Sequence, residues 1–215
     1  MQHVEIWHVL LDAGCGREAR FLQRFEGKAK RLIGVDIVEF HKNGAGNTLE
    51  LLNNDLRDIK LPDKSIDIVI SRSVLEHLEK PLSVYMEIFR ILKEGGYFSF
   101  LTPNLGHYSA LICKLIPNKF HSGVVLRTEG RKEEDTFPTY YRSNTFPTIN
   151  NLAQRAGFQL ISFKHLGQYP SYFAFNPILF LIATGYEKLI DKFHALRYLR
   201  GWLLVVLKRE GDVSP

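Results

Sequence analysis

Hydrophobic and polar positions along the first hundred residues follow two alternating periods. Short apolar runs predict buried strands, and the segments between them repeat apolar residues at helical spacing. We expect strands over residues 8–13, 31–37, 48–55, 65–74 and 97–103, with helices over residues 18–26 and 81–96. Strands that alternate with helices in this way predict βαβ units and a parallel sheet.

The helix expected over residues 81–96 has the most regular pattern. Its apolar side is made by Leu82, Tyr85, Met86, Phe89 and Leu92. Proline favours the first turn of a helix and glycine favours its end. We therefore place the start at Pro81 and the end at Gly95 and Gly96.

The pattern changes after residue 104. Residues 104–142 hold aromatic residues, histidines and a charged cluster without a clear period, which predicts an insertion over the sheet. Beyond it we expect helices over residues 145–158 and 176–193, and strands over residues 159–167 and 202–209. The whole chain, residues 1–215, is then one domain in which residues 104–142 and 168–200 form a lid over the substrate.

Composition and charge restrict the class of protein. A length of 215 residues allows one domain with a sizeable core. Two cysteines do not make a disulfide framework, and no N-terminal signal peptide is visible, so we expect a cytoplasmic protein. The net charge is −1 over residues 1–100 and +6 over residues 101–215. The basic second half predicts contact with an anionic substrate or a membrane surface, or simply a solvated basic face.

A glycine-rich turn, Gly14-Cys15-Gly16, follows the first strand. Glycine lets the backbone approach a ligand closely, and the helix expected next offers free N–H groups to an anion. The spacing up to Ala19 also fits the dinucleotide fingerprint of nicotinamide enzymes. The turn alone therefore leaves open which adenosine compound it binds.

Acidic side chains end three neighbouring strands, where an open parallel sheet binds its ligands. Asp12 ends the first strand. Asp36 ends the second, 22 residues after Gly14, where a carboxylate accepts both hydroxyls of a ribose. Asp55 ends the third. A carboxylate there accepts a hydrogen bond from the exocyclic amine of an adenine, or it stabilises a local turn. Ser71 to Ser73 and Thr102 to Asn104 end the next two strands.

Taken together, these residues resemble the class I S-adenosylmethionine-dependent methyltransferases, in the branch that includes ubiquinone-pathway and small-molecule enzymes. "LLDAGCG" resembles the first motif, "GVDI" the ribose-binding motif and "EIFRILKEGGYFSFLTPN" the last core helix and fifth strand. "NDLRDIKLPDKSIDIVISRSVLEHLEKP" resembles the adenine loop and fourth strand. The resemblance covers residues 9–104 well, and residues 145–167 and 202–209 loosely.

The resemblance implies an α/β fold: a doubly wound, Rossmann-like sheet of seven mostly parallel strands with the last strand antiparallel. It also implies S-adenosylmethionine as the cofactor, with the methionine end at the glycine turn, the ribose on Asp36, and the adenine on Asp55 and the backbone of Leu56. Ser71 and Arg72 would lie beside the sulfonium. The cofactor-binding residues that it implies are Asp12, Ala13, Gly14, Cys15, Gly16, Asp36, Ile37, Asp55, Leu56, Ser71 and Arg72.

One position departs from the family pattern. The first motif usually has glycine where this chain has Glu18. A side chain there crowds the cofactor, meets its ammonium group, or occupies a first helical turn, where an acidic residue is favoured. Two alternatives to a methyltransferase therefore stay open: a protein that binds the cofactor without turnover, and a nicotinamide oxidoreductase. The oxidoreductase needs a second nucleotide-binding half, which residues 104–215 do not supply.

Methyl transfer is an in-line displacement, so alignment does most of the work and a base serves only a protonated acceptor. The candidate catalytic bases are His77 and His107. Side chains expected at the acceptor are Tyr108, His121, Tyr140, Tyr141 and Arg142. The acceptor is expected to be a small molecule, lipid-like or a glycan precursor. No metal site is expected because the histidines are scattered, and no nucleic-acid motif is present.

The segment 176–193 is apolar nearly all round in its first half, from Ile178 to Ala183. One interpretation buries this helix against the sheet. The other docks it on a membrane, or over a lipidic acceptor, with a peripheral location for the protein. The basic residues that favour the second interpretation are Lys188, Lys192, Arg197 and Arg200.

Overall fold

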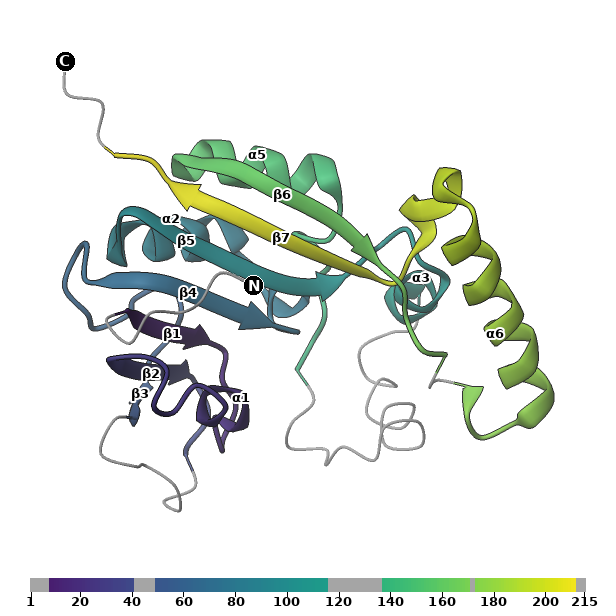
Figure 1. The fold of residues 1–215 in the computed structure, drawn as a ribbon, viewed down its shortest axis with the longest axis horizontal. Helices are drawn as coiled ribbons and strands as arrows, with labels where there is room; N and C mark the ends of the chain where they lie inside the picture. The colour runs from purple at the N-terminus through teal and green to yellow at the C-terminus, as the bar shows by residue number, and fades with distance from the viewer. Residues whose placement is uncertain (1–7, 41–48, 116–136, 171–172, 212–215) are drawn as a thin grey trace.

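The computed structural model describes residues 8–40, 49–115, 137–170 and 173–211. Within them seven strands form one sheet in the order β3-β2-β1-β4-β5-β7-β6 (Figure 1). The strands are β1 (Val9–Ala13), β2 (Arg31–Asp36), β3 (Leu49–Asn53), β4 (Ile66–Arg72), β5 (Leu92–Pro103), β6 (Phe158–Leu166) and β7 (Trp202–Arg209). Strands β1 to β5 pair in parallel, and β7 is antiparallel to both neighbours. The predicted sheet, with its last strand reversed, is confirmed.

Helices cover both faces of the sheet. On one face α1 (Arg20–Gln23) buries Leu22 against Leu10 and Leu32. On the other face lie α2 (Pro81–Ile91) and α5 (Phe146–Ala156) (Figure 1). They form the larger core, in which Tyr85 packs edge-on against Phe98. Burial of this apolar surface is the main term that stabilises the fold.

Helix α2 ends five residues earlier than its pattern predicts. Ile91 is its last residue, and the chain enters β5 at once, so Gly95 and Gly96 lie inside the strand. This end is capped from β7: the buried guanidinium of Arg209 donates to the carbonyls of Phe89 (2.5 Å), Arg90 (3.1 Å) and Leu92 (2.8 Å). These are carbonyl groups that a helix end leaves without a partner, and here a distant arginine binds them.

Helix α1 is also shorter than expected, with four residues instead of the nine over 18–26. Ala19 has a left-handed backbone (φ 45°), so a helix cannot run through it and begins at Arg20. After Gln23 the chain continues in turns. The expectation that Glu18 occupies a first helical turn is therefore wrong.

The remaining elements lie at the carboxyl ends of the strands. They are the 3-10 helix η1 (Leu75–His77), α3 (Tyr108–Leu115), α6 (Pro177–Lys192) and the 3-10 helix η5 (His194–Leu199). Helix α3 lies in the segment 104–142, where no periodic element is predicted. Helix α6 begins as predicted, since the side chain of Asn176 accepts from the backbone N–H of Ile178 (3.0 Å) and Leu179 (3.1 Å).

Helix α6 stands beyond the end of β5, next to α3 (Figure 1). Ile178, Leu181 and Ile182 are each about two thirds exposed, at 68%, 69% and 66%. The interpretation that buries this helix against the sheet is therefore wrong. No helix among the described residues is long and apolar enough to cross a bilayer.

Candidate functional site

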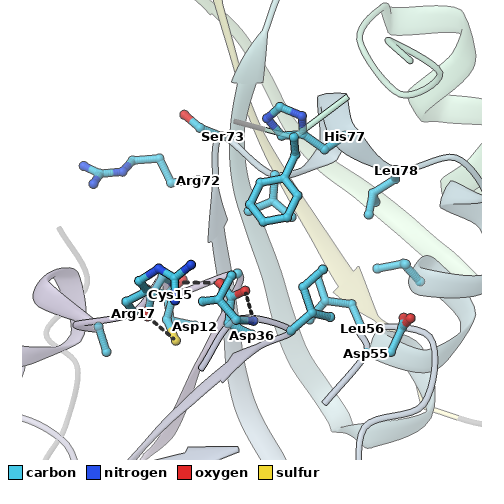
Figure 2. A pocket seen from close by; sticks show the side chains of 18 of the residues that line it. Asp12, Cys15, Arg17, Asp36, Asp55, Leu56, Arg72, Ser73, His77 and Leu78 are labelled. Carbon is cyan, nitrogen blue, oxygen red and sulfur yellow. Dashed lines mark hydrogen bonds between the residues drawn. The ribbon is translucent and has the colours of Figure 1, made fainter. Parts of the chain in front are cut away.

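A cavity of about 950 Å³ lies at the carboxyl ends of β1, β2 and β4. Strand order reverses here, because β2 and β4 flank β1 on opposite sides. Open α/β sheets bind ligands at such a switch point, and the volume suits a nucleoside-sized ligand. Figure 2 shows Asp12, Asp36 and Asp55 on one side of this cavity, with Arg72, Ser73 and His77 across from them.

The glycine turn holds its shape through steric and hydrogen-bond constraints. Gly14 has φ +84°, and a Cβ at this position would lie 2.2 Å from Cγ2 of Val74. Its N–H donates to the carbonyl of Val35 at 2.8 Å. Gly16 has φ +71° and open space around its Cα, so its backbone is bare toward a ligand. The turn therefore needs glycine at both positions, for different reasons.

Asp36 connects β2 to this turn. One carboxylate oxygen accepts from the N–H of Gly16 at 2.8 Å, and the other accepts from the N–H of Val38 at 3.2 Å. Each oxygen can accept a further hydrogen bond, because a carboxylate has about four acceptor positions. Asp36 is thus held in place with capacity for two neighbouring hydroxyl groups of a ligand.

Asp12 is the most buried acid of the cavity, with 4% of its surface exposed. Burial raises its pKa to about 7, and Asp36 acts in the same direction, whereas the positive charge of Arg72 lowers it. Near neutral pH the group is therefore divided between its acid and its carboxylate. A cationic ligand in the cavity would favour the carboxylate.

Asp55 and Leu56 form the far wall. The guanidinium of Arg57 donates to Asp55 from Nε (3.0 Å) and from its terminal nitrogen (2.6 Å), and its backbone N–H donates at 2.8 Å. These bonds lower the pKa of Asp55, so its oxygens stay ionised and act only as acceptors. Leu56 beside it is buried at the base of the wall and offers apolar surface.

Glu18 lines the cavity in front of α1. Its carboxylate pairs with the exposed side chain of Arg20. The chain thus carries an acid where the family pattern has glycine, and that acid is already bound by a neighbouring cation.

Nine of the eleven predicted cofactor residues line this one cavity: Asp12, Gly14, Cys15, Gly16, Asp36, Ile37, Asp55, Leu56 and Arg72. Ala13 and Ser71 lie behind its wall, where the hydroxyl of Ser71 donates to the carbonyl of Ala13 at 2.7 Å and joins β4 to β1. Burial also raises the pKa of the Cys15 thiol, which therefore stays protonated.

Residues that the sequence reasoning missed complete the wall on α1, after β4 and in the last part of the insertion. They include Phe21, Val74, Leu78, Glu79, Lys80, Phe137 and Pro138. Ser73, named as part of a strand end, also lines the cavity, and Val74 directly follows it. No local signal marks Phe137 and Pro138, which are more than 60 residues further along the chain.

The two candidate histidines lie in different surroundings. His77 lines the cavity, and its Nδ1 lies 2.9 Å from the carbonyl oxygen of Pro138. A carbonyl only accepts, so Nδ1 carries the hydrogen and the neutral ring has its lone pair on Nε2. His107 is fully buried and is not among the lining residues.

His107 instead binds α6 to the end of β5. Its Nε2 donates to the carboxylate of Glu187 at 2.9 Å, and its Nδ1 accepts from the backbone N–H of Ser109 at 3.3 Å. Burial lowers the pKa of His107, although Glu187 acts in the opposite direction. The neutral ring therefore has the opposite tautomer to that of His77.

Of the residues predicted for the acceptor, Tyr140 lines the cavity. Tyr141 is buried beside it, and both backbone N–H groups donate to the carbonyl of Glu76. Arg142 donates to the carbonyl of Glu79 at 2.8 Å, and its guanidinium lies over the ring of Tyr140. Tyr108 packs instead against His107 and Tyr186. His121 lies outside the described residues.

Comparison with known proteins agrees with this geometry. Residues 11–100 match the model of a family described as "Methyltransferase domain". A protein of Mycolicibacterium smegmatis named "Probable S-adenosylmethionine-dependent methyltransferase" is 31% identical over 143 residues, which are 61% of this chain and 55% of that protein. A sterol 24-C-methyltransferase of Gibberella zeae is 32% identical over 100 residues, 41% of this chain and 26% of that protein.

Among solved structures, an S-adenosylmethionine-dependent methyltransferase from Mesorhizobium loti superposes with a TM-score of 0.62. It is 18% identical in sequence, and the match covers 97% of this chain and 94% of that one. The fold of the described residues is therefore shared over nearly the whole length. The chain spans about half the length of the first curated relative and about a quarter of the second.

Proposed function

Because this chain belongs to the class I S-adenosylmethionine-dependent methyltransferases, whose cofactor is S-adenosylmethionine, we propose that it transfers the methyl group of that cofactor to a small, lipid-like acceptor. One observation carries the proposal. The glycine turn, Asp36 and Asp55 come from three neighbouring strands and line a single cavity.

The chemistry of the lining fits this cofactor. Its ribose has two neighbouring hydroxyls, which match the two oxygens of Asp36. Its adenine has an exocyclic amine, which can donate a hydrogen bond to the ionised Asp55. Its sulfonium and ammonium groups are cations, which favours a site with several carboxylates. Asp12 lies just before the glycine turn and would be ionised by such a charge.

The residues of this chain contribute mainly alignment and proton transfer. The bound cofactor supplies an electrophilic methyl on a good leaving group, so holding the acceptor in line accounts for most of the rate. We assign the proton to His77, because it lines the cavity and its Nδ1–H is fixed by Pro138, with Nε2 lying 4.0 Å from a carboxylate oxygen of Glu76. With the cofactor bound, Nε2 of His77 would take the proton that the acceptor loses as it is methylated.

The acceptor side of the cavity supports a lipid-like molecule. Phe21, Leu78, Phe137, Pro138 and Tyr140 give it an apolar and aromatic lining. A relative is named for methyl transfer to a sterol, and that name supports the same class of acceptor. A glycan precursor is the second candidate, since Glu79 and Lys80 at the rim offer polar contacts for a headgroup.

We further propose that the insertion 104–142 acts as the lid over the acceptor. Its last part supports this role, since Phe137, Pro138 and Tyr140 line the cavity and residues 140 and 141 bind the backbone of Glu76. The segment 168–200 is a weaker part of the proposal, because none of its described residues lines the cavity.

Titration calorimetry with S-adenosylmethionine tests the cofactor site. We expect Asp36→Ala to weaken binding by about 3 kcal/mol, or about 100-fold in Kd, because two charge-assisted hydrogen bonds are lost. Asp36→Asn keeps one acceptor oxygen and should lose less. The matched control is Asp58→Ala, an exposed aspartate paired with Lys60 outside the cavity lining, which should bind like the wild type.

Transfer of labelled methyl groups into lipid and aqueous cell extracts then identifies the acceptor. Label in the lipid extract supports the proposed class, whereas label only in sugar-containing material supports the glycan precursor. Tight cofactor binding without transfer to any fraction would favour a protein without turnover. Preferential binding of a nicotinamide dinucleotide would contradict the methyltransferase assignment altogether.

A further inference from the structure

Helix α6 exposes its aliphatic side to solvent and buries an acid on its inner side. We call Ile178, Leu181, Ile182, Gly185 and Leu189 the outer stripe; their spacing places them on one side of the helix. The three N-terminal members are each about two thirds exposed, and Leu189 is half exposed. The opposite side carries Glu187, of which only 5% is exposed. Water therefore meets the aliphatic side of the helix, and protein covers its acid.

The orientation of α6 is fixed by polar contacts on its inner side. The carboxylate of Glu187 accepts from His107, and Tyr186 packs edge-on against Tyr108. After the helix, the side-chain amide of Asn104 donates to the carbonyls of Tyr198 (2.8 Å) and Arg200 (2.7 Å). These bonds are satisfied only in the observed orientation, so the outer stripe cannot turn inward without breaking them.

Aromatic and basic side chains surround the outer stripe. Phe175 and Tyr169 are both 69% exposed near the start of α6. Lys188 and Lys192 are exposed in its second half, and the ammonium of Lys192 lies over the ring of Phe193. Of the two acids of α6, Glu187 is buried, and Asp191 is paired with Arg200 at 2.9 Å. The surface around the stripe is therefore apolar, aromatic and cationic.

We propose that the outer stripe of α6 docks on the surface of an anionic lipid bilayer. The helix would lie in the plane of the interface, with its aliphatic side chains among the acyl chains and its lysines at the phosphate groups. Charge complementarity favours lipid over a second copy of this basic chain. The stripe has four apolar side chains and one glycine, whereas a stable protein interface needs about 20–30 residues on each side.

The position of α6 links this surface to the proposed function without depending on it. Helix α6 stands beyond the carboxyl end of β5 (Figure 1), where His107 binds Glu187. The cavity lies at the carboxyl ends of β1, β2 and β4, on the same side of the sheet. Docking would bring that side to the bilayer, where a lipid-like acceptor is found. Docking itself needs neither the cofactor nor the transfer step, so the two proposals can fail separately.

Co-sedimentation with vesicles tests the proposal. The probes are phosphatidylcholine vesicles and phosphatidylcholine–phosphatidylglycerol vesicles, each at low and at physiological salt. We expect wild-type protein to bind the anionic vesicles. Ile178→Ser/Leu181→Ser/Ile182→Ser should lower the partition coefficient by about tenfold or more. The variant lacks three aliphatic side chains that would be buried in the bilayer on docking. Lys188→Glu/Lys192→Glu should remove the preference for anionic vesicles.

The matched control replaces apolar residues that are equally accessible but lie elsewhere. Met86 on α2 is 55% exposed and Ile161 on β6 is 49% exposed, so Met86→Ser/Ile161→Ser should bind vesicles like the wild type. Cofactor affinity and the urea midpoint of the triple variant should equal those of the wild type, which separates lost docking from misfolding.

Three results would overturn the proposal. Wild-type protein that stays in solution at low salt has no docking surface. A triple variant that binds vesicles like the wild type shows that the stripe is not that surface. A wild-type dimer that the triple variant converts to a monomer, seen by light scattering, assigns the stripe to a second copy of the chain. Failure of the wild type to bind S-adenosylmethionine would instead contradict the proposed function alone.

Discussion

The cavity and helix α6 distribute polar and apolar groups in opposite ways. At the cavity, acids and a histidine line open space, and apolar residues form the core behind them. At α6 an acid and a histidine are buried together, and aliphatic residues face outward. Each region has one histidine, and the two rings have opposite tautomers.

The difference shows what each polar group contributes. In the buried pair of His107 and Glu187 both ring nitrogens have partners, so the pair fixes an orientation and the ring has no lone pair to offer a substrate. His77 is held through Nδ1 at the wall of the cavity, and its Nε2 lies 4.0 Å from a carboxylate oxygen of Glu76. These surroundings support the proposed role of His77 as the base, whereas those of His107 support α6.

The largest effect is expected at His77. His77→Gln should lower kcat by about 10²- to 10⁴-fold for an acceptor that loses a proton, because the general base is removed. Cofactor affinity should stay within about twofold of the wild type, since the proton transfer involves the acceptor. Steady-state kinetics and titration calorimetry on the same preparation measure both quantities. A kcat unchanged by the substitution would exclude His77 as the base.

The second effect concerns the stability that the contact between His107 and α6 provides. His107→Leu should lower the free energy of unfolding by about 3 kcal/mol, because Glu187 is left buried without its donor. Glu187→Gln is the matched control, since an amide carbonyl still accepts from Nε2 and the loss should be about 1 kcal/mol. Urea unfolding measures both variants. A large fall in kcat with unchanged stability in His107→Leu would contradict the structural role of His107 and indicate a catalytic one.

The third prediction uses the proton on Asp12. Its pKa of about 7 means that cofactor binding near pH 6 should release close to one proton, and that binding should strengthen as pH rises toward 8. Calorimetry in buffers of different ionisation enthalpy measures the released proton. Asp12→Asn should bind without buffer dependence. Equal proton release by the variant would show that a group other than Asp12 releases the proton.

The same residue predicts how stability depends on pH. The pKa of Asp12 is raised above the ordinary value of 3.8. The folded protein therefore holds the proton more tightly, and this contribution to stability is present below about pH 4 and is lost as pH rises through about 7. The lowered pKa of His107 acts in the opposite sense, since the unfolded chain takes up that proton first as pH falls. Urea midpoints of Asp12→Asn across this range isolate the acid.

The smallest effect is expected at Glu18. Because its carboxylate is exposed and already paired with Arg20, Glu18→Gly should change cofactor affinity by less than about threefold. Arg20→Ala is the companion variant, as it frees the acid without removing it. A rise of more than tenfold in affinity for Glu18→Gly would mean that the acid obstructs the cofactor.

The strand ends were predictable because the rule behind them is local. A parallel sheet places the last residue of each strand at one edge, so Asp12, Asp36 and Asp55 could be grouped from their positions alone. The glycine turn was predictable for the same reason, since its backbone conformation requires glycine within a few residues of the strand.

The rest depends on partners that are distant in sequence. The end of α2 is capped by Arg209, 120 residues after Phe89, and the roles of the two histidines depend on Pro138 and Glu187. The early end of α1 depends on the left-handed backbone of Ala19, which the apolar pattern does not indicate. Hydrophobic periodicity reports which side of a helix is apolar, and in α6 it does not report which side faces the protein.

Strand β7 follows β6 along the chain and yet lies between β5 and β6 in the sheet. During synthesis on the ribosome, β6 therefore emerges before the strand that it will pair with. Until β7 has left the exit tunnel, one edge of β5 stays open and the carbonyls of Phe89 and Leu92 lack the guanidinium of Arg209. A messenger cut short before β7 would yield a product in which β5 has an open edge and β6 has no partner strand.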